Sequence, residues 1–309
     1  MIFSKKHFIS LKDMTAEEIL YVLSTADTMK YVLNQKNKKA PHLQGKSVFL
    51  VFEQKSTRSK LSYELAAQYL SANVVDLTAS GWFNEYLTLV ETGRVIDQMG
   101  GDFIILRHGM AGSAKLLSEN VNASVINAGD GYNENPSQAL VELMTIKNEK
   151  GGFDGLKVAI IGDLTNSRVT LSNIWGLMKL GAKVSVAGPP TLLHPHLDEF
   201  GVDVFFDPLE AVCDADVIMA LRTRKEEDYG NKLPSLDEYK SIFKIDEETL
   251  KYAKKDAIIM HPGSIKRGIE ISSKLIESKR CMVEDQISNG VAVRMALLYL
   301  LSLNVEEIK

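Results

Sequence analysis

Short apolar segments alternate with amphipathic helical stretches along most of this chain. The clearest pair is the apolar run at residues 48–52, followed by a polar bend and a helical pattern that places Leu61, Leu65, Ala66 and Leu70 on one face. Strands that alternate with helices form a parallel sheet, because a helix supplies the long crossover that each parallel connection needs. The sequence therefore predicts an α/β fold of parallel sheets flanked by helices.

The alternation occurs twice, which predicts two domains. The glycine pair after Lys150 interrupts the pattern, and 309 residues are enough for two domains of ordinary size. We expect a first domain at residues 1–150, a second at 151–285, and a C-terminal helix at 286–309 that packs on the first domain. Expected strands cover residues 48–52, 73–77, 103–106, 124–127, 156–161, 183–187, 202–206, 217–221 and 257–260. Expected helices include one that a capping box at Thr15 and Glu18 opens, and others at residues 88–99, 113–119, 137–148, 169–180, 208–213, 246–253 and 290–303.

Composition argues against several classes of protein. The net charge is −4, from 36 basic and 40 acidic residues, so binding to nucleic acid through bulk charge is not expected. Cys213 and Cys281 form no CxxC or zinc pattern, and we expect both to be reduced core residues of a cytoplasmic protein. The sequence shows no signal-peptide layout and no apolar run that approaches membrane-spanning length, so no membrane partner is expected.

The bend after the first apolar run carries three hydroxyls and two cations, at Ser56, Thr57, Arg58, Ser59 and Lys60. Backbone N–H groups at a helix start point outward without partners, and the helix dipole adds partial positive charge there. Such a turn can bind a phosphate. Taken alone, the pattern is equally typical of a simple helix cap formed by Ser56 or Thr57.

Polar groups follow several other predicted strands. The carboxyl ends of parallel strands share one edge of a sheet, which is where ligands bind in such folds. Arginines at four separate strand ends favour a site for phosphate or carboxylate groups over four unrelated surface residues. The polar strand ends beyond the first bend are Arg107 and His108, residues 127–130, Gly162 and Asp163 with Arg168 beyond, residues 222–224, and residues 261–263.

A dinucleotide site is the main alternative that the fold alone suggests. The strand at residues 157–161 is followed by a polar turn, but that turn lacks the G-x-G-x-x-G pattern that lets a backbone approach a pyrophosphate. The chain also lacks a G-x-x-x-x-G-K-[ST] loop. The alternative function, that of a nicotinamide-dependent dehydrogenase, therefore rests on fold analogy alone.

In order and spacing, these motifs resemble the aspartate/ornithine carbamoyltransferase family over nearly the whole chain, and most closely its aspartate branch. In the first half of the chain, Ser56 to Lys60 resemble the family's S-T-R-T-R, Arg107 and His108 its R-H, and residues 127–131 and 136–140 its N-A-G-D-G…H-P-T-Q-A-L. In the second half, residues 162–168 resemble its G-D-L…R, residues 221–226 its L-R-x-Q-x-E, and residues 260–271 its M-H-P-G-P-x-x-R-G-x-E-I. Residues 289–296 resemble a family segment near the C-terminus.

The resemblance implies a fold and a reaction. It implies a first domain that binds carbamoyl phosphate and a second that binds an amino acid acceptor. The expected reaction moves the carbamoyl group to the acceptor's amine, with L-aspartate first among the acceptors, giving N-carbamoyl-L-aspartate in pyrimidine biosynthesis. Members of this family are usually homotrimers with sites at subunit boundaries, sometimes with a regulatory chain. The resemblance implies no metal and no organic cofactor.

The resemblance also assigns roles to residues. It implies that carbamoyl phosphate is bound by Ser56, Thr57, Arg58, Ser59, Arg107, His108 and Gln138. Arg107 would bridge the phosphate and the carbonyl oxygen, Thr57 and His108 would lie near that oxygen, and Gln138 would contact the carbamoyl amide. With Arg58, these four are the expected catalytic residues, because donors and cations placed in advance stabilise the charge that develops on the carbonyl oxygen.

On the second domain, the resemblance implies a site for the acceptor. Arg168 and Arg222 would bind its carboxylates, and Arg224 stands in the same segment. The backbone at Gly263 and Ser264 would face the attacking amine. Holding two charged substrates in position is most of the catalytic task that this reaction sets.

The chain departs from the family pattern at several positions. Asn135 replaces the histidine before Pro-Thr-Gln, and an amide can donate a hydrogen bond but cannot carry a proton. The S-x-x-K-G-E stretch, whose lysine reaches a neighbouring subunit's site, is represented by residues 80–87, which contain no lysine but include Trp82 and Phe83. Arg224 replaces a glutamine, and Ser264 replaces a proline.

Three hypotheses follow. The first is carbamoyl transfer to aspartate. The second is carbamoyl transfer to another amine, because Trp82, Phe83 and Arg224 would reshape the acceptor site. The third is a non-catalytic relative that binds a ligand and acts through assembly or regulation. The arginines of the second domain and the absence of a Cys-bearing H-C-L-P segment, since Pro262 follows His261, favour a dicarboxylate over ornithine.

Overall fold

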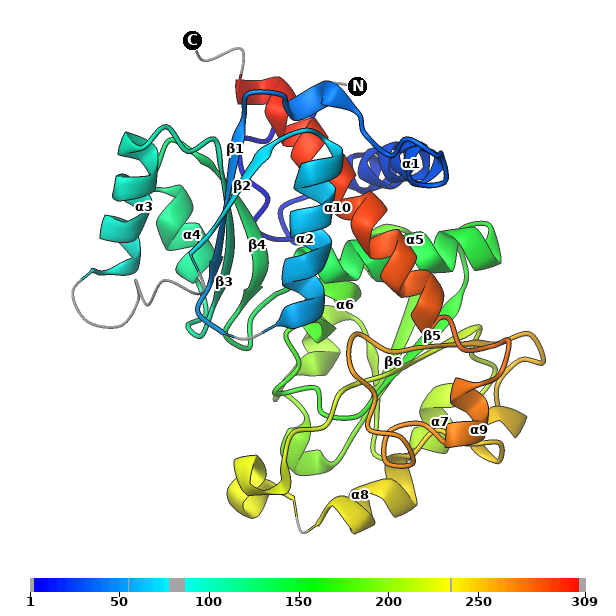
Figure 1. Ribbon diagram of the computed structural model, residues 1–309. Helices are drawn as coiled ribbons and strands as arrows, with labels where there is room; N and C mark the ends of the chain where they lie inside the picture. The colour runs from blue at the N-terminus through cyan, green and yellow to red at the C-terminus, as the bar shows by residue number, and fades with distance from the viewer. Residues whose placement is uncertain (1–2, 55, 78–86, 234, 306–309) are drawn as a thin grey trace. The chain divides into compact units, whose positions relative to one another are not determined.

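The computed structural model describes residues 3–54, 56–77, 87–233 and 235–305 (Figure 1). The chain divides into two compact units. The first contains the residues up to Met144 together with those from Ile287 onward, and the second is Thr145–Gln286. The boundaries therefore fall inside two helices, α5 (Pro136–Lys150) and α10 (Val283–Val305), rather than in the glycine pair at residues 151–152.

The first unit is built on a four-stranded parallel sheet with the order β2-β1-β3-β4. Every residue of β1 except the first is buried, as expected for a parallel strand covered on both faces. Helices α3 and α4 lie on one side of this sheet and α2 and α10 on the other (Figure 1). The strands are β1 (Ser47–Phe52), β2 (Asn73–Asp76), β3 (Phe103–His108) and β4 (Ser124–Asp130). The helices are α1 (Ala16–Leu33), η1 (Pro41–Leu43), α2 (Thr57–Tyr69), α3 (Leu89–Gln98) and α4 (Ser113–Ser118). Helices α5 and α10 each belong partly to this unit and partly to the second.

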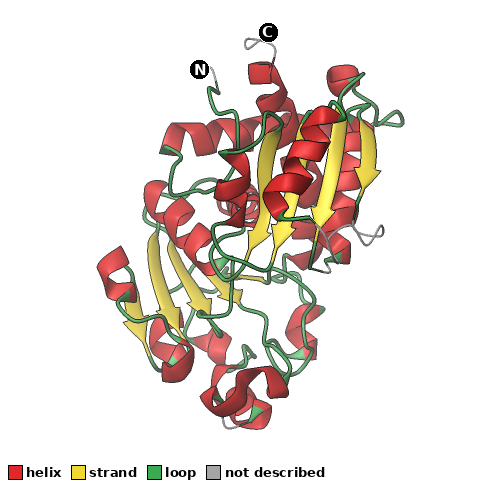
Figure 2. Cartoon of the chain, turned by 90° about the vertical axis from the view of Figure 1, so that its left-hand side faces the viewer, coloured by secondary structure: helices red, strands yellow, loops and turns green. Residues whose placement is uncertain are grey.

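The second unit has a five-stranded parallel sheet with the order β7-β6-β5-β8-β9. Figure 2 shows the strands of each sheet side by side with helices around them. The strands are β5 (Lys157–Ile161), β6 (Lys183–Ala187), β7 (Asp203–Phe205), β8 (Val217–Ala220) and β9 (Ile258–Met260). The helices are α6 (Thr170–Lys179), η2 (Pro190–Leu192), η3 (Leu197–Phe200), α7 (Pro208–Val212), η4 (Glu226–Lys232), α8 (Leu236–Phe243), η5 (Thr249–Lys251) and α9 (Ser273–Ile276).

The predicted α/β class is confirmed, and all nine expected strands are present. The capping box is also confirmed: the Thr15 N–H donates to Glu18 Oε2 at 2.9 Å, and the Glu18 N–H donates to Thr15 Oγ1 at 3.2 Å. Each sheet reverses its strand order at one place, between β1 and β3 in the first and between β5 and β8 in the second. Such switch points are where α/β folds bind ligands.

Some local predictions are wrong. The helix expected at residues 246–253 is only the short η5, and α8 was not predicted. On α2, Leu61 and Leu65 are 51% and 39% exposed, because the helix buries the neighbouring stripe that begins at Ser62 and Tyr63. Cys213 is exposed and Cys281 half-buried, so neither is a core residue, although both are free thiols.

The expectation that no apolar stretch approaches membrane-spanning length is also wrong. Residues Val283–Leu303 of α10 are long and apolar enough by length and composition, with a mean hydropathy of 1.3. However, 72% of this window is buried inside the protein. The helix therefore behaves as a core helix, and burial inside the protein accounts for its apolar composition.

Candidate active site

The first strand-order switch brings two of the predicted segments together. Phe52, at the end of β1, pairs with Arg107 of β3, and the Glu53 N–H donates to the Arg107 carbonyl at 3.0 Å. The chain then turns through Ser56 into α2. The predicted bend and the predicted Arg107–His108 pair therefore lie at neighbouring strand ends, at one edge of one sheet.

The start of α2 has the geometry expected of an anion site. Ser56 is the N-cap residue, yet its side chain makes no capping hydrogen bond to the described part of the helix. Thr57 is the first helical residue and is exposed, while Arg58 and Ser59 are half-buried. Ser56 therefore occupies the cap position without capping α2 through its side chain, and N–H groups that point outward from the first turn of a helix can bind an anion.

Lys60 has a different role from its neighbours. Its ammonium forms an ion pair with the carboxylate of Asp76, the last residue of β2. Both side chains are partly exposed, so this pair contributes little to stability. Lys60 therefore connects α2 to β2 through Asp76.

Arg107 and His108 are fixed by the loops that follow them. The Arg107 Nη1 donates to the Ala128 carbonyl at 3.1 Å. His108 is 7% exposed, and its Nδ1 accepts the Met110 N–H at 3.1 Å. A neutral imidazole that accepts at Nδ1 carries its proton on Nε2. His108 is therefore held as a donor at Nε2, which lies 3.5 Å from Glu53 Oε2.

The start of α5 supplies the third part of the first site. Asn135 precedes Pro136, and its Oδ1 accepts the Gln138 N–H at 3.3 Å and the Ser137 hydroxyl at 3.1 Å. Asn135 is thus the helix cap, with proline at the first helical position where it fits best. Gln138 is buried, and its Nε2 donates to Glu142 Oε1 at 3.4 Å.

Asp130 holds these loops in place, a role that its sequence motif did not reveal. Its carboxylate accepts the Gly112 N–H at 2.7 Å, the Glu134 N–H at 3.2 Å, and the side-chain amides of Asn127 at 2.9 Å and Asn133 at 3.1 Å. Four donors thus satisfy both oxygens of this buried carboxylate, which offsets the cost of burying it. Asp130 therefore connects the loops after β3 and β4, which carry His108 and Asn135.

The second unit gathers its predicted residues in the same way. Gly162 and Asp163 follow β5, and residues 221–224 follow the neighbouring strand β8. Arg168 is half-buried just before α6, Arg222 is exposed, and Arg224 is half-buried with its N–H donating to the Tyr229 hydroxyl at 2.9 Å. The three predicted acceptor arginines thus lie on the loops that follow two adjacent strands.

Glu270 organises the second unit's loops and was not singled out by sequence. One carboxylate oxygen accepts the N–H and hydroxyl of Thr223 at 2.6 and 2.8 Å, and the other accepts the Lys266 N–H at 2.7 Å and lies 3.0 Å from His261 Nε2. Glu270 thus joins the loop of Arg222 and Arg224 to the loop of residues 261–266, which contains Gly263 and Ser264.

Burial raises the pKa of Glu270, but hydrogen bonds and charge from His261, with the N–H groups of Lys266 and Thr223, outweigh burial and hold the pKa below its ordinary value. Asp163 behaves in the opposite way. Burial raises its pKa, and hydrogen bonds from Asn166 and Tyr229 offset this only in part. Glu270 therefore stays ionised to a lower pH than an ordinary glutamate does, and it holds its two loops together as a carboxylate. Asp163 instead gains a proton at a higher pH than an ordinary aspartate does.

The chain is similar to known proteins over nearly its whole length. The model of the aspartate/ornithine carbamoyltransferase carbamoyl-P binding domain matches residues 6–148, and that of the Asp/Orn binding domain matches residues 154–301. Aspartate carbamoyltransferase catalytic subunits of Acetivibrio thermocellus and Ruminiclostridium cellulolyticum are 56% and 50% identical to it, over 98% of this chain and 97% of theirs. The chain belongs to the aspartate/ornithine carbamoyltransferase family.

Solved structures of both branches of the family share this fold. Ornithine carbamoyltransferase from Pyrococcus furiosus is similar with a TM-score of 0.85 and 29% identity, over 97% of this chain and 98% of that one. The catalytic subunit of M. jannaschii aspartate transcarbamoylase is similar with a TM-score of 0.82 and 34% identity, over 98% and 99%. The predicted family and fold are confirmed.

The structure gives Asn135, one of the departures from the expected sequence pattern, a definite role. Where the family pattern has histidine, this chain has an amide whose oxygen is committed to capping α5. The other marked departure, at residues 80–87 with Trp82 and Phe83, lies outside the described residues except for Leu87.

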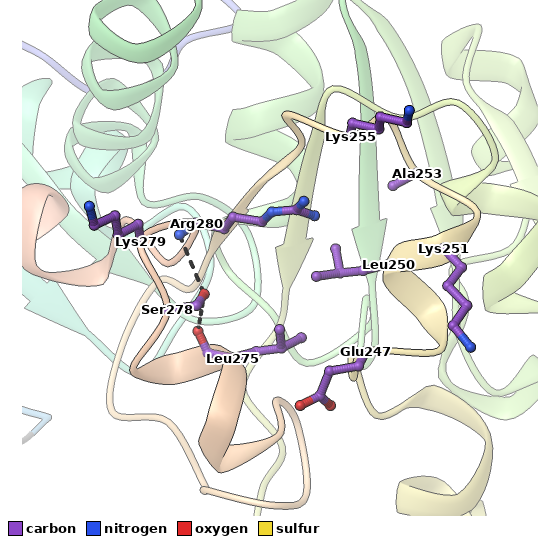
Figure 3. A pocket seen from close by; sticks show the side chains of 9 residues that line it. All are labelled: Glu247, Leu250, Lys251, Ala253, Lys255, Leu275, Ser278, Lys279 and Arg280. Carbon is purple, nitrogen blue, oxygen red and sulfur yellow. Dashed lines mark hydrogen bonds between the residues drawn. The ribbon is translucent and has the colours of Figure 1, made fainter.

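A pocket of about 650 Å³ lies elsewhere in the second unit (Figure 3). It contains none of the predicted site residues. Four cations and one carboxylate surround an apolar floor, and the lysines point outward in different directions (Figure 3). Its lining residues are Glu247, Leu250, Lys251, Ala253, Lys255, Leu275, Ser278, Lys279 and Arg280.

The hydrogen bonds of Glu270 predict a difference in stability between the wild type and the Glu270→Gln variant. In Glu270→Gln, an amide NH2 group replaces one carboxylate oxygen and cannot accept a hydrogen bond. We therefore expect the free energy of unfolding at pH 7 to fall by about 2–3 kcal/mol. Because the folded-state pKa is lowered, the wild-type carboxylate stabilises the fold above the ordinary glutamate pKa, and this contribution is lost as pH falls through the lowered pKa. Urea unfolding at a series of pH values should show the two proteins converging in acid.

The matched control is Glu277→Gln. Glu277 is 69% exposed and pairs with Arg267 at 2.7 Å. Loss of this exposed pair is expected to change the unfolding free energy by less than about 1 kcal/mol. Equal effects of the two substitutions would contradict the role given to Glu270.

Proposed function

We propose that this protein transfers the carbamoyl group of carbamoyl phosphate to the amine of L-aspartate, giving N-carbamoyl-L-aspartate and phosphate. The observation that carries the proposal is that the segment leading into α2 and the Arg107–His108 pair lie at the ends of the neighbouring strands β1 and β3, at the strand-order switch of the first sheet. The names of the relatives, aspartate carbamoyltransferase catalytic subunits at 56% and 50% identity, support aspartate as the acceptor.

On the first unit, the phosphate binds at the start of α2. The side chains of Ser56, Thr57, Arg58 and Ser59, with the N–H groups of the first turn, supply the donors. Arg107 reaches both phosphate and carbonyl oxygen from the neighbouring strand end.

The carbonyl oxygen gains negative charge as the amine adds to the carbamoyl carbon. His108 Nε2–H, Arg107 and Thr57 are the donors for this oxygen, and they are effective because the loops around them hold them in place before the reaction. Gln138 contacts the carbamoyl amide. The bond from carbon to the phosphate oxygen breaks, phosphate leaves with the electron pair, and the nitrogen loses a proton.

On the second unit, arginines select the acceptor. Arg168, Arg222 and Arg224 match the two carboxylates of aspartate, whereas a second amine, as in ornithine, would be repelled by them. The backbone at Gly263 and Ser264 faces the amine, and Glu270 holds that loop against the loop of Thr223. Glu270 is thus a positioning residue for the acceptor.

Carbamoyl transfer to a different amine is the second candidate function. It is favoured by Arg224, which replaces the family's usual glutamine and whose backbone is fixed by the Tyr229 hydroxyl. An additional arginine in this segment would suit an acceptor with more negative charge than aspartate.

We further propose a cytoplasmic homotrimer that serves pyrimidine biosynthesis, with a regulatory chain as a possible partner. The words "catalytic subunit" in the relatives' names support a multi-subunit assembly. Leu61 and Leu65, exposed on the helix that opens the phosphate site, supply apolar surface for a second copy. The two free cysteines are compatible with a reducing compartment.

Arg58 is the first test of the phosphate site. In Arg58→Ala, we expect inorganic phosphate binding, measured by calorimetry, to weaken by about 100-fold, because one partner of a charge-assisted contact worth about 3 kcal/mol is lost. Arg94→Ala removes an exposed arginine of α3 and should leave binding unchanged. Normal phosphate affinity in Arg58→Ala would show that the phosphate binds elsewhere.

The acceptor is tested by turnover. Purified protein with carbamoyl phosphate should form a ureido product from aspartate and none from ornithine, because only aspartate offers a second carboxylate to the arginines. Product from another amine alone would support the second candidate function. If no amine reacts while a bisubstrate phosphonate–aspartate analogue still raises the melting temperature, the protein is a ligand-binding relative without activity.

A further inference from the structure

The C-terminal helix carries a buried arginine on an otherwise apolar surface. Arg294 is 4% exposed, and its neighbours Val293 and Met295 are fully buried. Arginine is almost never fully buried unless it is paired. Its position on α10 therefore requires a specific explanation.

Arg294 is directed at α2. Its Nη1 donates to Ser62 Oγ at 2.9 Å and to the Gly290 carbonyl at 2.8 Å, and its guanidinium lies 4.8 Å above the ring of Tyr63. A Cβ at Gly290 would come within 2.7 Å of Nη1, so glycine leaves room for this arrangement. Ser62 and Tyr63 are in the helical turn that directly follows the proposed phosphate-binding turn.

The charge of Arg294 has no carboxylate partner among the described residues. No ion pair joins it to any acidic side chain in that part of the chain, and its Nε has no acceptor there. Burial lowers the pKa of Arg294, the Tyr63 hydroxyl opposes this, and the nearby charge of Arg58 lowers it further. Arg294 and Arg58 therefore act on each other as like charges, which an anion between or beside them would relieve.

We propose that Arg294 is a positioning residue of the phosphate site: its buried positive charge is balanced by the phosphate dianion bound at the first turn of α2, and its hydrogen bond to Ser62 holds that helix in place. This inference rests on the proposed function of the first unit. Arg294 does not touch the phosphate. It raises the affinity for the dianion through its charge, which the low-dielectric interior screens poorly.

A purely structural role would give a different result. If Arg294 only filled space and bonded Ser62, a neutral side chain that keeps a donor would preserve phosphate binding. Arg294→Gln keeps an N–H donor and loses the charge, whereas Arg294→Lys keeps the charge and loses the planar fork. Met295→Leu, a volume-conserving change at the next position of the same buried helix, is the packing control.

The test is calorimetric titration with inorganic phosphate at pH values on both sides of its second ionisation. We expect Arg294→Gln to weaken binding by about tenfold at the higher pH and much less at the lower pH, where the ligand carries one negative charge fewer. Arg294→Lys should recover most of the affinity, and Met295→Leu should match the wild type. In turnover, Arg294→Gln should raise KM for carbamoyl phosphate more than it lowers kcat.

Phosphate affinity in Arg294→Gln within twofold of the wild type at both pH values would overturn the inference, and so would an equal loss in Arg294→Lys and Arg294→Gln. If Arg294→Gln fails to fold, the pH dependence of phosphate binding in Arg294→Lys decides the question. A wild-type-like preference for the dianion supports the role of charge, and loss of that preference contradicts it.

Because the ligand is inorganic phosphate, a wild type that binds it but carbamoylates no amine would contradict the proposed function and leave this inference standing. A wild type that binds no phosphate contradicts both.

Discussion

The parallel pairing of β1 with β3 determines where the first unit can bind an anion. Because Phe52 lies opposite Arg107, the chain that leaves β1 and the side chains that end β3 emerge at the same place. The strand order reverses there, so the connections on the two sides leave in opposite directions, and such switch points are where α/β folds bind ligands. The segment that leads into α2 therefore follows β1 beside the strand end that carries Arg107 and His108. The loop contacts of Asp130 and the cap at Asn135 then fix the remaining donors.

The second unit also places its predicted residues beyond a strand-order switch, and Glu270 connects its loops as Asp130 connects those of the first unit. Its strand order reverses between β5 and β8, and the arginines lie on the loops beyond those strands. Glu270 comes from much later in the chain and connects two of these loops by four close contacts. A buried carboxylate is expensive to desolvate, so its presence is best explained by the positions it enforces on the loops of Thr223 and His261.

The sequence predicted the elements and the residues that share strand ends, because both follow from local periodicity. Ser56 to Ser59 were predicted from a strand, a bend and a helix, and Arg107 and His108 from the end of another strand; the structure places the two segments at the ends of neighbouring strands. Asp130, Glu270 and Arg294 were not assigned roles, because their importance comes from partners far away in the chain. Leu61 and Leu65 were placed on the wrong face of α2, since two overlapping stripes fit the helical period and only packing chooses between them. The eight-residue α8 was also missed, although Leu236, Tyr239 and Phe243 recur at helical spacing and Ser235 caps its start.

A crystal structure of the protein with a bisubstrate phosphonate–aspartate analogue tests the central claim most directly. The account predicts that the phosphonate lies at the first turn of α2, within hydrogen-bond distance of the Ser56 to Ser59 segment and of Arg107, with the carbonyl oxygen near His108 Nε2. The analogue's carboxylates should contact arginines among Arg168, Arg222 and Arg224. A phosphonate bound anywhere else, for example in the pocket lined by Lys251 and Arg280, would contradict it.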